Sequence, residues 1–123
     1  MLKLMLSLKK FFLILVTGIC LLSLMACQKE EFRSDTIYLF WQPGCSHCHH
    51  AINFFNNELS TVRVEMIDVS KKEGYEKLMR AIKKFKLGNE IATPLFVVKD
   101  KTVMGWSNEI GAGFKKLGPA FQK

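Results

Sequence analysis

Two cysteines with two residues between them, Cys45 and Cys48, follow an apolar run and a Pro-Gly pair. The run at 36–41 is rich in β-branched and aromatic residues and stops just before Pro43 and Gly44, which predicts a strand ending in a turn. After the first cysteine, apolar residues recur on one side of a helix without a breaker. The pattern therefore predicts a strand, a turn and a helix whose first turn carries both thiols.

This placement gives the two thiols different chemistry. Unpaired N–H groups and the positive end of the helix dipole stabilise a thiolate at a helix N-terminus, so we expect Cys45 to be the nucleophile. Cys48 lies one turn further into the helix, from where it can attack a mixed disulfide on Cys45 and release the partner. His47, between the cysteines, adds a donor or partial positive charge near the Cys45 sulfur, which favours the reduced form and an oxidising couple.

The stretch Trp41-x-Pro43-Gly44-Cys45-x-x-Cys48 resembles the active-site sequence of the thioredoxin superfamily. Its tryptophan stands four residues before the first cysteine, as in thioredoxins. The resemblance implies a thiol–disulfide oxidoreductase in which Trp41 lines the approach to a redox-active disulfide between Cys45 and Cys48, with no other cofactor and no metal.

The rest of the chain predicts the other elements of this fold. Alternating residues predict a second strand at 62–69, and helical spacing predicts a helix from its cap at Ser70 to Gly88. That helix carries an apolar stripe expected to be core: Tyr75, Leu78, Met79, Ile82 and Phe85. Strands at 91–98 and 102–106 and a final helix follow. The order matches the minimal thioredoxin-like α/β fold, a mixed four-stranded sheet with helices on both faces.

Pro94, preceded by Thr93, stands at the start of the predicted third strand. In the superfamily a cis proline at this place packs beside the cysteines, so the resemblance implies that Thr93 and Pro94 form the edge where an extended partner segment docks. The alternative is an ordinary edge-strand proline. The sequence also departs from the family. Leu39 replaces the buried acidic residue of thioredoxins, and the sequence at 105–108 lacks the Gly-Gly stretch with which glutaredoxins bind glutathione.

The first 26 residues have the pattern of a secretory signal. Lysines precede an apolar segment at 11–24, which is shorter than the about 20 residues of a spanning helix. The sequence Leu24-Met25-Ala26-Cys27 resembles a bacterial lipobox, which implies cleavage before Cys27 and lipid attachment to it. An uncleaved membrane anchor is the alternative. In both cases the folded part lies outside the cytoplasm and is held to a membrane, facing the periplasm if the source is Gram-negative.

These features predict a lipoprotein signal peptide at 1–26, a polar tether at 27–35 and a thioredoxin-like domain at 36–123. Of the 18 basic residues, three precede Cys27, whereas all 11 acidic residues follow it, which leaves the mature part near +4. No basic stripe interleaved with aromatic residues suggests nucleic acid. Only Cys45 and Cys48 remain as free thiols in the mature fold, too few for a disulfide framework, so the pair suits catalysis better than structure.

The same residues allow other functions. The sequence from Cys45 to His49 also fits C-x-x-C-H, the attachment motif of c-type haem, with His49 as proximal ligand and Met104 as distal ligand. A copper or zinc site could use Cys45, Cys48, His49 and His50. However, small cytochromes c are helical, and consecutive ligands on one helical turn diverge. A non-catalytic binding module on this scaffold usually lacks one of the cysteines.

We therefore expect a monomeric, lipid-anchored thiol–disulfide oxidoreductase of the bacterial cell envelope. It would exchange disulfides with protein thiols, and a membrane redox protein is a candidate partner. Cys45 is the expected nucleophile, Cys48 the resolving thiol and His47 the residue that tunes the thiolate. The pattern allows oxidation, reduction or isomerisation.

Overall fold

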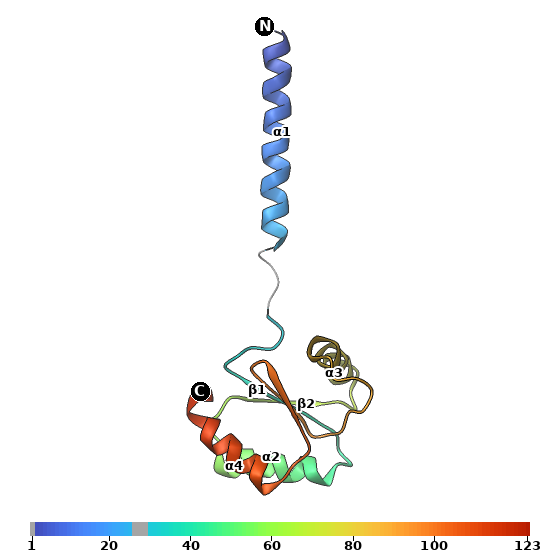
Figure 1. The fold of residues 1–123 in the computed structure, drawn as a ribbon, viewed down its shortest axis with the longest axis vertical. Helices are drawn as coiled ribbons and strands as arrows, with labels where there is room; N and C mark the ends of the chain where they lie inside the picture. Colours follow the sequence, from blue (N-terminus) through green and yellow to red (C-terminus); the bar gives the residue numbers. More distant parts are fainter. Residues whose placement is uncertain (1, 26–29) are drawn as a thin grey trace. The chain divides into compact units, whose positions relative to one another are not determined.

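The computed structural model describes residues 2–25 and 30–123. The chain divides into two units, Met1–Glu31 and Phe32–Lys123. The first contains one helix, α1 (Leu2–Met25), drawn in blue in Figure 1. Within the described ranges, none of the helices combines the length and the apolar character needed to cross a membrane. Cys27, the predicted lipidation site, lies outside the described residues.

The second unit is a sheet with helices. Its elements are β1 (Ile37–Trp41), α2 (Ser46–Glu58), β2 (Val64–Asp68), α3 (Lys72–Phe85), β3 (Leu95–Val98), β4 (Lys101–Met104), α4 (Asn108–Leu117) and the 3-10 helix η1 (Gly118–Phe121). The strand order is β2-β1-β3-β4; β1 is parallel to β2 and antiparallel to β3, and β3 and β4 form a hairpin. This is the thioredoxin-like α/β fold, which confirms the predicted fold class.

The central strand β1 is buried on both faces, which explains its continuous apolar sequence. Ile37 and Leu39 belong to a core cluster with residues of α2, α4 and η1. Tyr38 and Phe40 point the other way, into a second cluster with α3. The helices therefore cover both faces of the sheet, with α2 and α4 on one side and α3 on the other (Figure 1).

The folded unit begins before the first strand. Phe32 is only 3% exposed, and its ring centroid lies 5.1 Å from that of Tyr38 and 5.7 Å from that of Phe85. The backbone N–H of Arg33 donates to the Tyr38 hydroxyl at 2.8 Å. Part of the segment predicted as a tether is thus folded, because Phe32 fills the α3 side of the core.

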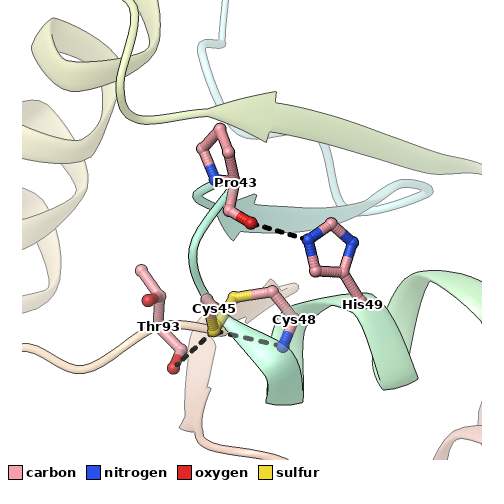
Figure 2. Close-up of a disulfide and its surroundings, with 5 residues drawn as sticks. All are labelled: Pro43, Cys45, Cys48, His49 and Thr93. Atoms are coloured by element: carbon pink, nitrogen blue, oxygen red, sulfur yellow. Dashed lines mark hydrogen bonds between the residues drawn. A yellow bond between two sulfur atoms is a disulfide. The ribbon is translucent and has the colours of Figure 1, made fainter.

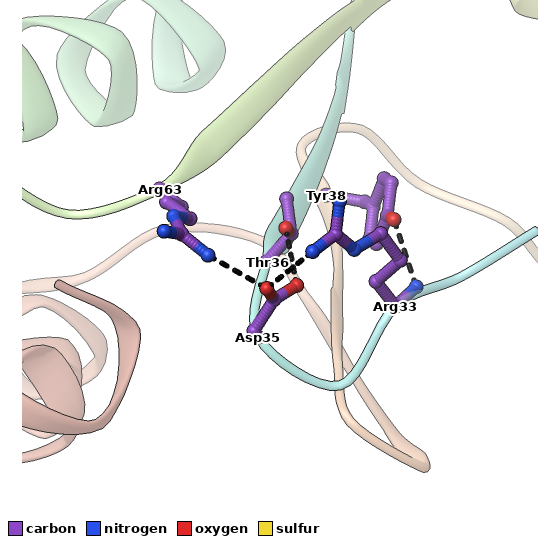
Figure 3. Close-up of polar contacts among 5 residues, drawn as sticks. All are labelled: Arg33, Asp35, Thr36, Tyr38 and Arg63. Atoms are coloured by element: carbon purple, nitrogen blue, oxygen red, sulfur yellow. Dashed lines mark hydrogen bonds and ion pairs between the residues drawn. The ribbon is translucent and has the colours of Figure 1, made fainter. Parts of the chain in front are cut away.

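Asp35 ties this N-terminal segment to the loop before β2. Its carboxylate accepts hydrogen bonds from Arg33 at 2.6 Å, Arg63 at 2.7 Å and the Thr36 hydroxyl at 3.0 Å (Figure 3). The hydrogen bond from Thr36 is the largest cause that lowers the pKa of Asp35, and the two guanidinium groups add to it against a partial desolvation. The network is exposed, so each ion pair contributes little to stability.

Both predicted ends of α3 are wrong. The N-cap is Lys71, whose side chain makes no capping hydrogen bond. Ser70 instead donates its hydroxyl and its N–H to the Asp68 carboxylate, at 2.6 and 2.9 Å. At the other end, Lys86 adopts a left-handed conformation with φ 53° and ends the helix before Gly88 is reached.

Candidate active site

Cys45 and Cys48 are joined by a disulfide at the N-terminus of α2 (Figure 2). Cys45 is the N-cap residue, and its sulfur accepts the backbone N–H of Cys48 at 3.1 Å. Cys48 is fully buried, whereas Cys45 is partly exposed. Of the two sulfurs, that of Cys45 is therefore open to an incoming partner, and an N–H group is already in place to stabilise a thiolate there.

The Pro-Gly turn places Cys45 at the start of the helix. The Cys45 N–H donates to the carbonyl of Gln42 at 3.2 Å, which closes the turn, and the Cys45 carbonyl accepts the N–H of His49 at 3.2 Å, which begins the helix. Behind the site, Leu39 is fully buried in the same core cluster as Ala51. The wall where thioredoxins carry an acidic residue is thus apolar.

The predicted Thr93–Pro94 edge lies beside the disulfide. The peptide bond between these residues is cis, as the resemblance implied. The Thr93 carbonyl oxygen lies 3.5 Å from the Cys45 sulfur, although the two residues are 48 positions apart (Figure 2). A disulfide sulfur carries no proton, so this is a contact in the oxidised state, and only a reduced Cys45 can donate to the carbonyl. The Pro94 carbonyl accepts the N–H of Gly105 at 2.8 Å, which ties the edge to the end of β4.

The two histidines that flank Cys48 lie in different surroundings. His47 is exposed, and its ring centroid is 6.4 Å from that of His50; across the described residues no hydrogen bond joins His47 to either sulfur. His49 was missed as a site residue. Its Nε2 lies 2.8 Å from the carbonyl oxygen of Pro43 (Figure 2), and its ring centroid is 6.0 Å from that of Trp41. The sequence did hold a signal for His49. It stands four residues after the N-cap Cys45, and residues four apart lie on the same face of a helix.

The structure also bears on the alternative functions. The disulfide uses both sulfurs that covalent haem attachment requires, and the sheet differs from the helical architecture expected for a small cytochrome c. In the two described ranges, His, Cys, Asp and Glu side chains nowhere form a group of three or more that could hold a metal ion.

A groove of about 540 Å³ runs from the active-site turn along α3. The residues that line it include Gln42, Tyr75, Met79, Ile91, Ala92 and Thr93. Tyr75 and Met79 were predicted as core, but they are 53% and 40% exposed. The prediction holds for Leu78, which is buried, because the sheet covers only part of the apolar stripe. A second groove of about 460 Å³, between the β3–β4 hairpin and α4, shares no lining residue with the cysteine site.

No family model and no curated protein matches the sequence. The structure is similar to the crystal structure of a glutaredoxin from Archaeoglobus fulgidus, with 26% sequence identity over 60% of this chain and 78% of that chain and a TM-score of 0.47. The thioredoxin-like topology and the Cys-x-x-Cys disulfide at the start of a helix indicate a thiol–disulfide redox enzyme.

Proposed function

We propose that this chain is a thiol–disulfide oxidoreductase that exchanges its Cys45–Cys48 disulfide with cysteines of protein partners in the bacterial cell envelope. One observation carries the proposal: an accessible Cys45 sulfur at a helix N-terminus is bonded to a buried Cys48 sulfur. A two-step exchange needs one accessible sulfur whose thiolate is stabilised by an N–H group and one protected sulfur beside it.

The exchange follows from this asymmetry. A partner thiolate attacks the Cys45 sulfur, the Cys45–Cys48 bond breaks, and Cys48 leaves as a thiolate, so that a mixed disulfide joins the partner to Cys45. A second partner thiolate then attacks the partner's own sulfur and releases the enzyme as a dithiol, with two electrons transferred to it. In the reverse direction, the Cys45 thiolate attacks a partner disulfide and Cys48 resolves the product. The Cys48 N–H, 3.1 Å from the Cys45 sulfur, stabilises the negative charge in both directions.

Three neighbouring residues have roles in the proposed disulfide exchange. Thr93 offers its backbone, next to Pro94, for strand-like pairing with an extended partner segment, because its carbonyl lies beside the Cys45 sulfur. Trp41, at the end of β1, lines the approach. His47 tunes the thiolate through its field rather than through a hydrogen bond, because it is exposed beside the cysteines.

We further propose that Cys27 carries a lipid that holds the enzyme to a membrane outside the cytoplasm. The support is the sequence alone: a basic start, an apolar segment and a lipobox-like Leu24–Cys27 stretch. Growth with an alkyne-labelled fatty acid tests this, since the wild-type chain should take up label and Cys27→Ser should not. Label on the variant would contradict lipidation at this residue.

The redox activity is tested with the oxidised full-length chain in a mild detergent and a peptide that carries two cysteines. We expect the peptide to become oxidised while the chain gains two free thiols, and Cys45→Ser to abolish the transfer. A wild-type chain that neither oxidises the reduced peptide nor, in its dithiol form, reduces the oxidised peptide would contradict the proposal.

A further inference from the structure

The register of the sheet gives the folded unit two distinct ends. Ile37, at the start of β1, pairs with Val98 at the end of β3, so the β3–β4 turn lies where the chain enters the unit (Figure 1). The Arg63 N–H donates to the carbonyl of Phe121 at 2.7 Å, which brings the C-terminal segment to the same end. Cys45 follows β1 and therefore lies at the opposite end of the sheet. We call the first the entry end and the second the cysteine end.

The two ends differ in charge. The segments that meet at the entry end carry seven basic and three acidic residues: Arg33, Arg63, Lys99, Lys101, Lys115, Lys116 and Lys123, against Asp35, Glu58 and Asp100. At the cysteine end, the end of β2 and the starts of α3 and α4 carry more acidic than basic residues: Asp68, Glu73 and Glu109, against Lys71 and Lys72. The positive charge of the folded unit is thus concentrated away from the disulfide, which favours an acidic partner at the entry end.

Some of the basic side chains at the entry end have no internal partner. Asp35 is already paired with Arg33 and Arg63 (Figure 3), and Glu58 is paired with Lys115. The remaining four lysines are exposed, and within the described part of the chain no carboxylate pairs with them: Lys99, Lys101, Lys116 and Lys123. Their charge is therefore available to an outside partner.

An apolar groove opens beside these lysines. It is the groove of about 460 Å³ between the β3–β4 hairpin and α4. Its charged lining residues, Lys99, Asp100 and Lys101, all belong to the hairpin turn, whereas the rest of its wall consists of apolar side chains and one glycine. Leu117, in this wall, is 43% exposed. A basic rim beside apolar surface matches an anionic lipid layer, which offers both negative headgroups and hydrocarbon, better than an acidic polypeptide, which offers only charge.

We propose that the entry end docks on an anionic phospholipid surface, with the four lysines beside headgroup phosphates and the groove at the boundary of the hydrocarbon. The inference rests on the proposed anchoring at Cys27, which precedes Phe32 by five residues, a chain length that reaches at most about 18 Å. Electrostatic attraction and apolar contact then both hold the entry end at the surface to which the chain is tethered.

Docking in this way fixes where the disulfide lies. Helix α2 begins next to Cys45 and ends at the entry end, and its 13 residues span about 20 Å. This distance exceeds the Debye length of about 8 Å at physiological salt, so the cysteine end lies beyond the charge of the membrane surface. The cysteine pair is therefore presented to partners outside the bilayer.

The test uses the chain isolated from bacterial membranes in a mild detergent and reconstituted in two kinds of nanodisc. One contains phosphatidylcholine alone, and the other contains equal parts of phosphatidylcholine and phosphatidylglycerol. Lysines are acetylated with a small amount of uncharged N-acetoxysuccinimide, and the rate at each lysine is measured by mass spectrometry. The entry-end variant is Lys101→Glu with Lys116→Glu. The matched control, with the same change in charge at the cysteine end, is Lys71→Glu with Lys72→Glu. A sample in detergent with polyglutamate represents an acidic protein partner.

We expect Lys99 and Lys123 of the wild-type chain to be acetylated about fivefold more slowly on anionic than on neutral nanodiscs, the factor that one basic residue contributes at an anionic surface. Lys71 and Lys72 should keep their rates. The protection should disappear in about 1 M salt, where the Debye length falls to about 3 Å. The entry-end variant should lose most of the protection, and the control variant should keep it.

Three results would overturn the inference and leave the proposed anchoring intact: equal rates on the two nanodiscs, equal protection of lysines at both ends, or protection that survives in the entry-end variant. Protection by polyglutamate without protection on anionic nanodiscs would assign the entry end to an acidic protein and would also overturn it. A chain that enters neither kind of nanodisc would contradict the anchoring at Cys27, and the inference with it.

Discussion

The Nε2 atom of His49 lies 2.8 Å from the carbonyl oxygen of Pro43. Since a carbonyl oxygen can only accept, Nε2 carries the proton in this contact. The bond joins the first turn of α2 to the turn before Cys45, so a residue next to the second cysteine helps to hold the backbone in front of the first.

Replacing His49 by alanine should loosen this turn. A hydrogen bond contributes about 0.5–1.5 kcal/mol, so hydrogen exchange of the Cys45 amide, which bonds to Gln42, should be accelerated by up to about tenfold. Amide exchange by NMR measures it. The matched control is His50→Ala, one position further along α2, which should leave this amide unchanged. Equal exchange in both variants would show that the contact does not hold the turn.

Replacing Cys48 by alanine should trap partners on Cys45. Without the buried resolving sulfur, a mixed disulfide persists, because no internal thiol remains to displace the partner. Non-reducing electrophoresis of cells that express the variant should show covalent complexes that dithiothreitol removes. Cys45→Ala should form none, because Cys48 is fully buried. Complexes on Cys45→Ala rather than on Cys48→Ala would reverse the two roles.

Replacing His47 by alanine should make the Cys45–Cys48 couple more reducing. The side chain is exposed and reaches the sulfurs only through its field, so we expect a decrease of about 10–30 mV, where 30 mV corresponds to about 1.4 kcal/mol. Equilibration with glutathione buffers measures the potential of the full-length chain. His50→Ala, whose ring neighbours that of His47, is the control and should change it less. An unchanged reduction potential in His47→Ala would show that His47 does not tune the cysteines.

Replacing Gly74 by alanine should strongly destabilise the fold. A Cβ at this position of α3 would lie 1.9 Å from the backbone oxygen of Asp68 and 2.7 Å from its carbonyl carbon. Backbone atoms cannot rotate away, so the helix must shift from β2, at a cost of at least about 2 kcal/mol. Gly113→Ala in α4 is the control, because its Cβ would meet nothing within 4 Å. It should stabilise the helix by up to about 1 kcal/mol. Urea unfolding measures the free energy of unfolding of both variants. A similar decrease in the two would contradict the close packing of Gly74 against the Asp68 backbone.

Replacing Asp35 by asparagine should change how stability depends on pH. The Thr36 hydroxyl and the two guanidinium groups lower the pKa of Asp35, so the carboxylate stabilises the fold at a pH above the ordinary carboxyl value. This contribution is lost as the pH falls through the lowered pKa. The difference in melting temperature between wild type and variant should thus be largest near neutral pH and shrink below about pH 4. Asp100→Asn, in the turn between β3 and β4, is the control. If the difference in melting temperature between wild type and Asp35→Asn did not depend on pH, the role of the Asp35 network would be contradicted.

The predictions from sequence succeeded where a local pattern carries the information. The β-rich run before Pro43, the helix after Cys45 and the strand after Pro94 each have a periodicity and a punctuating residue, and their order identifies the sheet. Cys45 and Thr93 lie together because β1 and β3 are antiparallel neighbours, so the residues after β1 and those before β3 meet at the same end of the sheet.

The remaining features depend on contacts that no local pattern records. Phe32 is a single aromatic residue in a polar segment, so its burial against Tyr38 leaves no periodic signal. The apolar stripe of α3 predicts one continuous face, but the width of the sheet decides that Tyr75 stays exposed. At the end of that helix, Lys86 takes the left-handed conformation that a glycine two positions later was expected to provide.

The two tryptophans are placed as separate optical reporters. Trp106 lies among Phe54, Phe96 and Phe114, with its ring nearly parallel to that of Phe114 at an interplanar angle of 11°. Its emission therefore reports the aromatic core. Trp41 stands half-buried at the end of the strand that leads to the disulfide, and disulfides quench nearby indole emission. In a Trp106→Phe chain the remaining fluorescence would follow the redox state of the cysteines in real time, without an added dye.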